Sequence, residues 1–334
     1  KAFLKSVRNR PNLRVQSGAQ AKRVLMENRR ATGVEMRVNG VDQVAMARGE
    51  VVLAAGAIGS PHLLELSGIG RPETLQALGI DVRHALPGLG ENLQDHLQLR
   101  LIYKLKDALT LNTLSASLWG KARIGLEYLL KRSGPMSMAP SQLGAFAKSD
   151  PSLETPDLEY HVQPLSLDRF GEPLHPFPAL TASVCNLRPE SRGSVHAVTP
   201  HFTDAPAIRP NYLSTAGDRR VAAAAIRLTR RIMAQPPMLK HDPAEYKPGI
   251  AFQNDAELAQ AAGQIGTTIF HPVGTAKMGG DEKAVVDERL RLHGIDGLRV
   301  IDASVMPTIT SGNTNAPVLM IAEKGAAMIR ADRS

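Results

Sequence analysis

His271 is the residue of this chain with the clearest potential for chemistry. It lies in the segment FHPVGTAKMGG, residues 270–280, among small residues. Imidazole titrates near neutrality, so a histidine that a ligand can approach is suited to accept a proton. Gly274, Thr275 and the pair Gly279–Gly280 leave room for such an approach. Two interpretations of His271 follow: a proton acceptor, or a histidine satisfied within its own loop.

The segment SGNTNAPVLMIAEK, residues 311–324, predicts a helix start that could face a ligand. Pro317 suits the first turn of a helix, and Thr314 or Asn315 would cap it. Asn313 lies just ahead of that start, and helix N-termini favour negative charge. The segment fits either an ordinary capped helix or a site that holds an anion, or a developing anion, at residues 313–316.

Asp302 offers a carboxylate at the end of the β-rich run LRVI, before the small residues Ala303 and Ser304. A carboxylate in this position either binds hydroxyl groups of a ligand or closes a turn. The residues themselves leave both roles open.

Rival chemistries find little support in the motifs. The chain contains neither G-x-S-x-G nor H-E-x-x-H, and its G-x-G segments GIGRPE and GLGENL lack the third glycine of a dinucleotide fingerprint. Cys185 is the single cysteine, which excludes an internal disulfide. No ligand spacing relates it to the histidines, so we expect no metal site.

Composition narrows the class of protein further. The 334 residues carry 40 Lys and Arg against 32 Asp and Glu, a net charge of +8. These charges are scattered, and no nucleic-acid-binding motif accompanies them, so we expect no nucleic-acid partner. Contact with an anionic membrane surface stays open. No apolar run of 18 residues exists, so nothing predicts a membrane-spanning helix.

The first hundred residues predict strands, then a helix and a loop. Strands are expected within 11–19, 22–28, 31–40 and 42–56, with a tight turn at Asn39-Gly40. The run VVLAAGA, residues 51–57, predicts a strand buried on both faces, ending at Ala55 and Gly56. In SPHLLELSGIG we expect a short helix with Ser60 as N-cap and Gly68 as its stop. PGLGENLQDH, residues 87–96, predicts a loop at the surface or a domain edge.

The sequence pattern changes between residues 106 and 263, which predicts a second domain of strands backed by helices. Helices are expected in 115–132 and 216–235, and strands in 156–165, 180–189 and 193–198. From residue 264 the sequence pattern resembles that of the first hundred residues again. A strand is expected in GLRVIDASVMP and a closing helix in NAPVLMIAEKGAAMIRA.

Several of these segments together resemble one family. GAIGSPHLLELSGIG (56–70), FHPVGTAKMG (270–279) and VIDASVMPTITSGNTNAPVLMIAEKGAAMI (300–329) are similar to signature segments of GMC (glucose–methanol–choline) oxidoreductases, FAD-dependent enzymes that act on alcohols. The chain resembles their C-terminal three-fifths, and the SGNTNAP form resembles bacterial choline-dehydrogenase-like alcohol dehydrogenases.

The resemblance implies a fold and a domain division. The fold would be α/β combined with α+β: an incomplete, Rossmann-like FAD/NAD(P)-binding domain plus a substrate domain with an antiparallel sheet backed by helices. Residues 1–105 and 264–334 would form the discontinuous FAD-binding domain, and 106–263 the substrate-binding domain.

The resemblance also implies an activity and roles for residues. His271 would take the hydroxyl proton of a primary alcohol, and Asn313 would donate a hydrogen bond to the substrate oxygen, while hydride leaves for flavin N5 and an aldehyde forms. General-base catalysis of this kind typically accelerates a reaction about 10²–10⁴-fold. The FAD-binding positions would be Ala21, Ala55, Gly56, Asp302, Ala303, Thr314, Asn315 and Ala316.

One departure from the family pattern concerns the start of the chain. Family members begin with a strand, G-x-G-x-x-G and helix that seat the ADP half of FAD, and no such segment is present here. The chain also starts without Met or the apolar core of a signal peptide. We expect a fragment or a chain that pairs with a separately encoded N-terminal half; the alternative is a truncated, non-catalytic fragment that does not bind FAD alone.

The expected partners are a small alcohol and an electron acceptor, either oxygen or a quinone-type molecule. The chain is poor in aromatic residues, with Trp119 its single tryptophan, and a quaternary ammonium usually binds in an aromatic cage. We therefore expect an uncharged aliphatic or benzylic alcohol rather than choline. The expected location is the cytoplasm, or the periphery of the inner membrane, of a bacterium.

Overall fold

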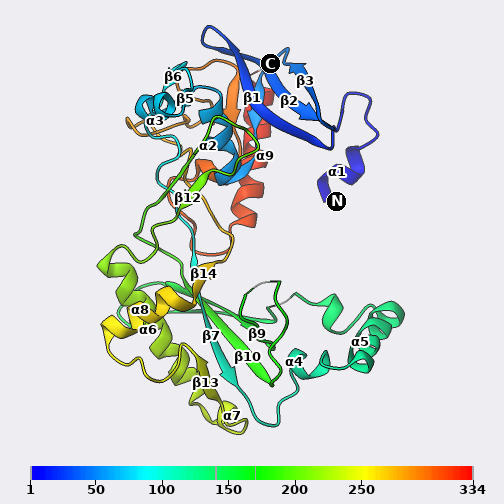
Figure 1. Cartoon of the computed structure of the whole chain (residues 1–334), viewed down its shortest axis with the longest axis vertical. Helices are drawn as coiled ribbons and strands as arrows, with labels where there is room; N and C mark the ends of the chain where they lie inside the picture. The colour runs from blue at the N-terminus through cyan, green and yellow to red at the C-terminus, as the bar shows by residue number, and fades with distance from the viewer. Residues whose placement is uncertain (1, 140, 170, 333–334) are drawn as a thin grey trace.

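The chain folds into two bodies, each around its own core (Figure 1). The computed structural model describes residues 2–139, 141–169 and 171–332. One core cluster combines buried residues from 24–89 with others from 276–305, and the second draws on residues 99–262. The chain thus leaves the first body, builds the second and returns.

The lower body is built on an antiparallel sheet with strand order β13-β7-β10-β9-β8, in which β14 also pairs with β7. Helix α6 (Ala216–Met233) packs on this sheet, burying Ala222, Ala225 and Ile226. Thr215 caps α6 by accepting a hydrogen bond from the Asp218 amide. The other elements of this body are β7 (Leu97–Lys104), β8 (Leu143–Ala147), β9 (Leu158–Gln163), β10 (Ala179–Asn186), β13 (Ala244–Lys247), β14 (Gly266–Thr268), α4 (Leu111–Leu114), α5 (Leu118–Lys131), η1 (Pro135–Ser137), α7 (Pro236–Leu239) and α8 (Asp255–Ile265).

The upper body combines an antiparallel three-stranded sheet, β1-β2-β3, with the parallel pair β4 and β15. Helix α2 (Gly56–Leu66) follows β4 directly, and α9 (Asn315–Ala331) closes the chain (Figure 1). Its remaining elements are α1 (Ala2–Val7), β1 (Ala19–Glu27), β2 (Arg30–Val38), β3 (Val41–Met46), β4 (Val51–Leu53), β5 (Ile69–Gly70), α3 (Pro72–Ala77), β6 (His84–Ala85), β11 (Ser194–His196), β12 (Ala207–Arg209), β15 (Leu298–Val300) and η2 (Ala303–Val305).

Two predictions about the first strands are wrong and one is confirmed. The expected strand over 11–19 does not form: residues 11–17 are exposed and pair with none of the described strands. The strand ending at Leu53 is buried on one face only: Val51 and Leu53 are buried, whereas Val52, which points to the opposite face, is 41% exposed. The tight turn at Asn39-Gly40 is confirmed, with φ of 48° and 85° and Val38 paired to Val41.

Helix α2 starts five residues earlier than predicted. Ser60 does not cap it but lies inside it, and its hydroxyl donates to the Asp302 Oδ2 at 2.6 Å. The predicted stop is confirmed: Gly68 follows the C-cap with φ of 83°.

The loop 87–96, predicted to lie at the surface or a domain edge, is found at a domain edge and is largely buried. It runs from the upper body into β7, and Gln94 pairs with Val273. Its position between the two bodies explains the burial. The segment therefore joins the two bodies beside His271.

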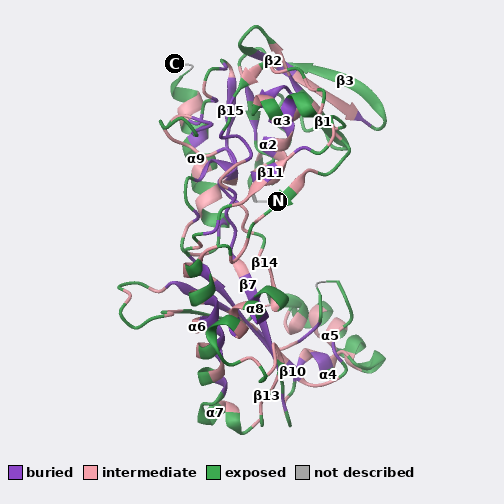
Figure 2. Cartoon of the chain, turned by 60° about the vertical axis from the view of Figure 1, so that its left-hand side comes forward, coloured by how far each residue is buried: buried purple, intermediate pink, exposed green. Residues whose placement is uncertain are grey.

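Helix α5 points apolar side chains into solvent. Leu118 and Trp119 are 84% and 87% exposed, and no residue of the helix is buried. Figure 2 shows α5 at the margin of the lower body, in the colours of exposed and intermediate residues. No helix in the described part of the chain is long and apolar enough to cross a membrane.

The predicted domain boundaries stay predictions. The two cores support a discontinuous first domain, but β7 and β14 lie outside 106–263 and pair in the lower sheet. Conversely β11, inside that range, packs on α2 of the upper body.

Candidate functional site

His271 lies where the two bodies meet, three residues after β14. Its backbone amide donates a hydrogen bond to the Asp95 Oδ1 at 2.9 Å, and its side chain is partly buried. Asp95 precedes β7, which pairs with β14. The strand pairing therefore brings residues 95 and 271 together across 176 positions of sequence.

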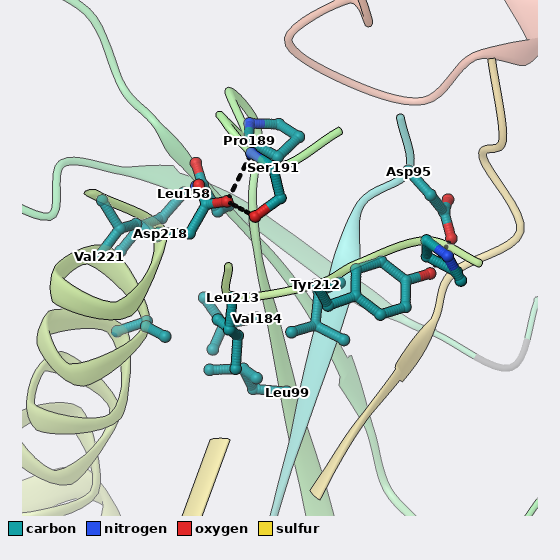
Figure 3. Close-up of a pocket in the computed structure, with 15 residues that line it drawn as sticks. Asp95, Leu99, Leu158, Val184, Pro189, Ser191, Tyr212, Leu213, Asp218 and Val221 are labelled. Atoms are coloured by element: carbon teal, nitrogen blue, oxygen red, sulfur yellow. Dashed lines mark hydrogen bonds between the residues drawn. The ribbon is translucent and has the colours of Figure 1, made fainter. Parts of the chain in front are cut away.

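Asp95 is itself held by two hydroxyl groups. Its Oδ2 accepts hydrogen bonds from Tyr212 and, at 2.5 Å, from Thr268. Figure 3 shows Tyr212 pointing at Asp95 along one side of a small cavity under α6. The cavity volume is about 30 Å³, and Leu99 and Val184 are among its lining residues. It has room for a water rather than a substrate.

The ring of His271 is oriented by a second histidine. The Nδ1 atoms of His96 and His271 lie 3.0 Å apart, with the rings edge to face at 83°. The His96 Nε2 lies 3.2 Å from the carbonyl oxygen of Leu187, which can only accept. A neutral His96 therefore donates from Nε2 and accepts at Nδ1. It follows that His271 carries its proton on Nδ1 and presents the lone pair of Nε2.

Burial keeps both rings neutral. It lowers the pKa of His96 to about 4, with the neighbouring His271 acting in the same direction. Burial also lowers the pKa of His271, against the opposing effect of the Asp95 charge. A neutral His271 with a defined lone pair is able to accept a proton at physiological pH.

Asp302 lies between β15 and η2 and is 5% exposed, and its side chain reaches the turn between β4 and α2. Its Oδ2 accepts from the Gly56 amide and the Ser60 hydroxyl, and its Oδ1 accepts from the amide and hydroxyl of Ser304. Both carboxylate oxygens are thus used within the protein. The side chain closes a turn, so a contact of Asp302 or Ala303 with a cofactor falls to the backbone.

The other predicted cofactor positions border this turn or start α9. Ala55 is exposed, and Gly56 has φ of 77° with open space where a Cβ would stand. Helix α9 begins at Asn315 without a side-chain cap from Thr314. Asn313, Asn315 and Ala316 are exposed, whereas Thr314 is buried. Ala21 lies exposed on β1.

No direct hydrogen bond joins His271 to Asn313 in the described part of the chain, but one segment connects their surroundings. Leu187 accepts from His96, and the next residue, Arg188, donates to Ser311. Gln94 similarly bonds both to the backbone of 273 and to 307–309. The segments around His271 and Asn313 are therefore held by hydrogen bonds to the same two parts of the chain, Gln94 and residues 187–188.

Sequence reasoning missed Asp95, His96 and Leu187. The first two lie in QDH, within the segment predicted to be a loop at the surface or a domain edge. A polar triplet directly before a strand was the available signal, but its importance depends on pairing with residues far along the chain.

Two protein-family models described as GMC oxidoreductase match residues 1–98 and 189–322 of this chain. The oxygen-dependent choline dehydrogenases of Citrobacter koseri and Stenotrophomonas maltophilia are 40% and 39% identical over 99% of this chain. The chain spans 59% of the length of each of these relatives.

Solved structures show the same fold. Pyridoxine 4-oxidase from Mesorbium loti matches with a TM-score of 0.83 and 30% identity, over 97% of this chain and 59% of the other. Formate oxidase of Aspergillus oryzae, in a structure that concerns modification of its FAD, matches with a TM-score of 0.90 and 26% identity, over 98% of this chain and 62% of the other. These matches confirm the predicted mixed fold class.

Proposed function

Because the chain belongs to the GMC oxidoreductase family, we propose that it forms the catalytic and substrate-binding part of an FAD-dependent alcohol oxidoreductase. The family predicted from the motifs is thereby confirmed. The proposed reaction oxidises the CH–OH group of a primary alcohol to an aldehyde. The observation that carries the proposal is the fixed orientation of His271 by His96.

In this proposal His271 accepts the hydroxyl proton of the alcohol at Nε2. The Nδ1 proton stays in the hydrogen bond to His96, so the ring needs no rearrangement before it acts. The hydrogen bond from the His271 amide to Asp95 fixes the backbone of the loop. Asn313, exposed at the start of α9, donates to the substrate oxygen and sets its orientation.

The residues of this chain fit one side of an FAD site. Ala55 and Gly56 expose backbone at the end of β4, and the open space at Gly56 admits close approach. The uncapped first turn of α9, residues 314–316, offers amide groups and a favourable dipole for negative charge. The backbone of 302–303 and of Ala21 would complete the contacts. FAD, when bound, supplies the hydride acceptor.

The substrate class and the electron acceptor are part of the proposal. We expect an uncharged aliphatic or benzylic primary alcohol, because the described surroundings of His271 are histidine, carboxylate and hydroxyl groups rather than an aromatic cage. Oxygen or a quinone-type molecule would accept the electrons. Relatives named oxygen-dependent choline dehydrogenase make choline the competing substrate to test.

Flavin binding and turnover test the proposal together. The purified chain is titrated with FAD, alone and with a polypeptide that supplies the remaining length of the relatives, and then assayed with benzyl alcohol, butanol and choline. A saturable, perturbed flavin spectrum and turnover of the uncharged alcohols are expected. A folded chain that neither binds FAD nor turns over any alcohol in either form would contradict the proposal, and preference for choline would overturn the substrate class.

Helix α5 has features of a helix that binds a membrane surface. Exposed Leu118, Trp119, Leu126 and Leu129 recur at helical spacing along α5, with basic residues flanking them, a pattern typical of interfacial helices. We propose contact with the anionic surface of a bacterial inner membrane. Trp119 is the only tryptophan, so its emission reports on α5 directly. A blue shift with anionic but not with neutral vesicles is expected; no shift with either would refute the contact.

A further inference from the structure

Three potential metal ligands lie side by side on the lower sheet. Glu159 and His161 alternate along β9 and therefore point to the same face. Cys185 on β10 is paired directly with Glu159, so its side chain shares that face. Ligand atoms of the three residues all lie within 4.8 Å of one another. The spacing along the chain did not predict this group, because the register of β9 against β10 creates it.

The group contains polar atoms that the described part of the chain leaves unsatisfied. Glu159 is 5% exposed, and its Oε2 has no hydrogen-bond partner there. The His161 Nε2 also has no hydrogen-bond partner there, and it lies 3.5 Å from the Glu159 Oε1. A buried polar group without a partner costs about 1–3 kcal/mol. A ligand that bonds both atoms would remove this cost.

The setting favours a bare ion over an organic molecule. The unsatisfied oxygen and nitrogen are shielded from solvent, and none of the described cavities is lined by Glu159 or His161. A set of thiolate, imidazole and carboxylate suits Zn²⁺ better than Mg²⁺ or Ca²⁺, which prefer oxygen ligands. We propose that Glu159, His161 and Cys185 bind one Zn²⁺ ion.

A fourth ligand is available on the same face. Ser183 stands opposite His161 in the strand register, and its buried hydroxyl oxygen has no partner among the described residues. This hydroxyl, or a water, would complete a tetrahedral set. Binding converts the Cys185 thiol to a thiolate and releases one proton to solvent, so zinc affinity rises with pH.

Metal binding at these three residues does not depend on catalysis, so failure of the zinc site and failure of the proposed function are distinguishable.

Cobalt spectroscopy tests the site in the full chain. Co²⁺ bound by a thiolate gives a ligand-to-metal charge-transfer band, which one equivalent of Co²⁺ is expected to saturate and Zn²⁺ to abolish. Cys185→Ser should lose the band, and Glu159→Gln should weaken binding at least about 10-fold. His201→Ala, at an exposed histidine outside the group, is the matched control and should bind as the parent does.

Two results would overturn the site. One is absence of a thiolate band in the folded parent chain. The other is a band that persists in Cys185→Ser, which would indicate adventitious binding elsewhere. Circular dichroism of each variant establishes folding, and Glu159→Gln supplies an independent reading if Cys185→Ser does not fold.

Discussion

The Nδ1 atoms of His96 and His271 lie 3.0 Å apart, and the other nitrogen of His96 faces the Leu187 carbonyl. The carbonyl fixes the tautomer of His96, which in turn fixes that of His271. The lone pair of His271 therefore lies on Nε2 whatever the substrate is. This relationship makes specific predictions about variants of both residues.

Replacing His96 should affect His271 without removing it. In His96→Ala the Nδ1 proton of His271 loses its acceptor, so both tautomers become populated and turnover should fall about 10–100-fold. His96→Gln retains one donor and one acceptor and should recover most of the activity. Nitrogen NMR of the ring gives a readout independent of stability: one tautomer in the parent, two in His96→Ala. A single tautomer in His96→Ala would contradict the assignment.

Turnover should depend on pH through His271. Burial lowers the pKa of this group from its ordinary value of 6.5, and only the neutral ring accepts a proton. The rate constant kcat/KM should therefore rise with pH through a midpoint below 6.5 and stay level above it. A midpoint well above 6.5 would mean that another group controls the reaction. The measurement is a pH profile at constant ionic strength.

Gly56 and Gly263 form a matched pair of glycine substitutions. Gly56 has φ of 77°, so Gly56→Ala should lower the free energy of unfolding by about 1–2 kcal/mol and weaken FAD binding. Gly263 lies exposed within α8 (Asp255–Ile265), with open space where a Cβ would stand. Gly263→Ala should therefore raise the free energy of unfolding by about 0.5–1 kcal/mol. Urea unfolding checks both. Equal effects of the same sign would refute the argument from φ.

His196 should make stability pH-dependent. Its ring bonds the fully buried Glu65 at 2.7 Å, which raises the pKa of His196 above its ordinary value of 6.5. Because the folded state binds the proton more tightly, this contribution is complete below pH 6.5 and is lost as pH rises through the raised value. His196→Ala should lower the free energy of unfolding by about 1–3 kcal/mol at pH 6 and by less at high pH.

Thermal unfolding across pH measures this difference, with His201→Ala as the exposed control. A difference in Tm between the parent and His196→Ala that widens as pH rises would contradict the predicted direction of the pH dependence. The same pair joins β11 to α2, so its loss also tests how the upper body is held together.

The sequence predicted those features that depend on local chemistry. The closing helix was predicted with the bounds it has in α9, because its apolar spacing and Pro317 are local signals. Asn39-Gly40 likewise marks a turn by itself. The expected cap Ser60 was wrong because Asp302, 242 residues away, engages its hydroxyl instead.

Features that depend on long-range pairing escaped prediction. The contact of Asp95 with residue 271 and the grouping of Glu159 with Cys185 both follow from strand register in the lower sheet. Residues 11–17 have a strand-like composition, but no strand in the described part of the chain pairs with them. The roles predicted for His271, Asn313 and the cofactor-binding positions stay predictions.

Anaerobic reduction of bound flavin by alcohol, followed by stopped flow in the FAD-loaded protein, is the most direct test of His271 as the base. His271→Ala should bind FAD as the parent does and reduce it about 10²–10⁴-fold more slowly. Reduction at the parent rate in that variant would contradict the central claim.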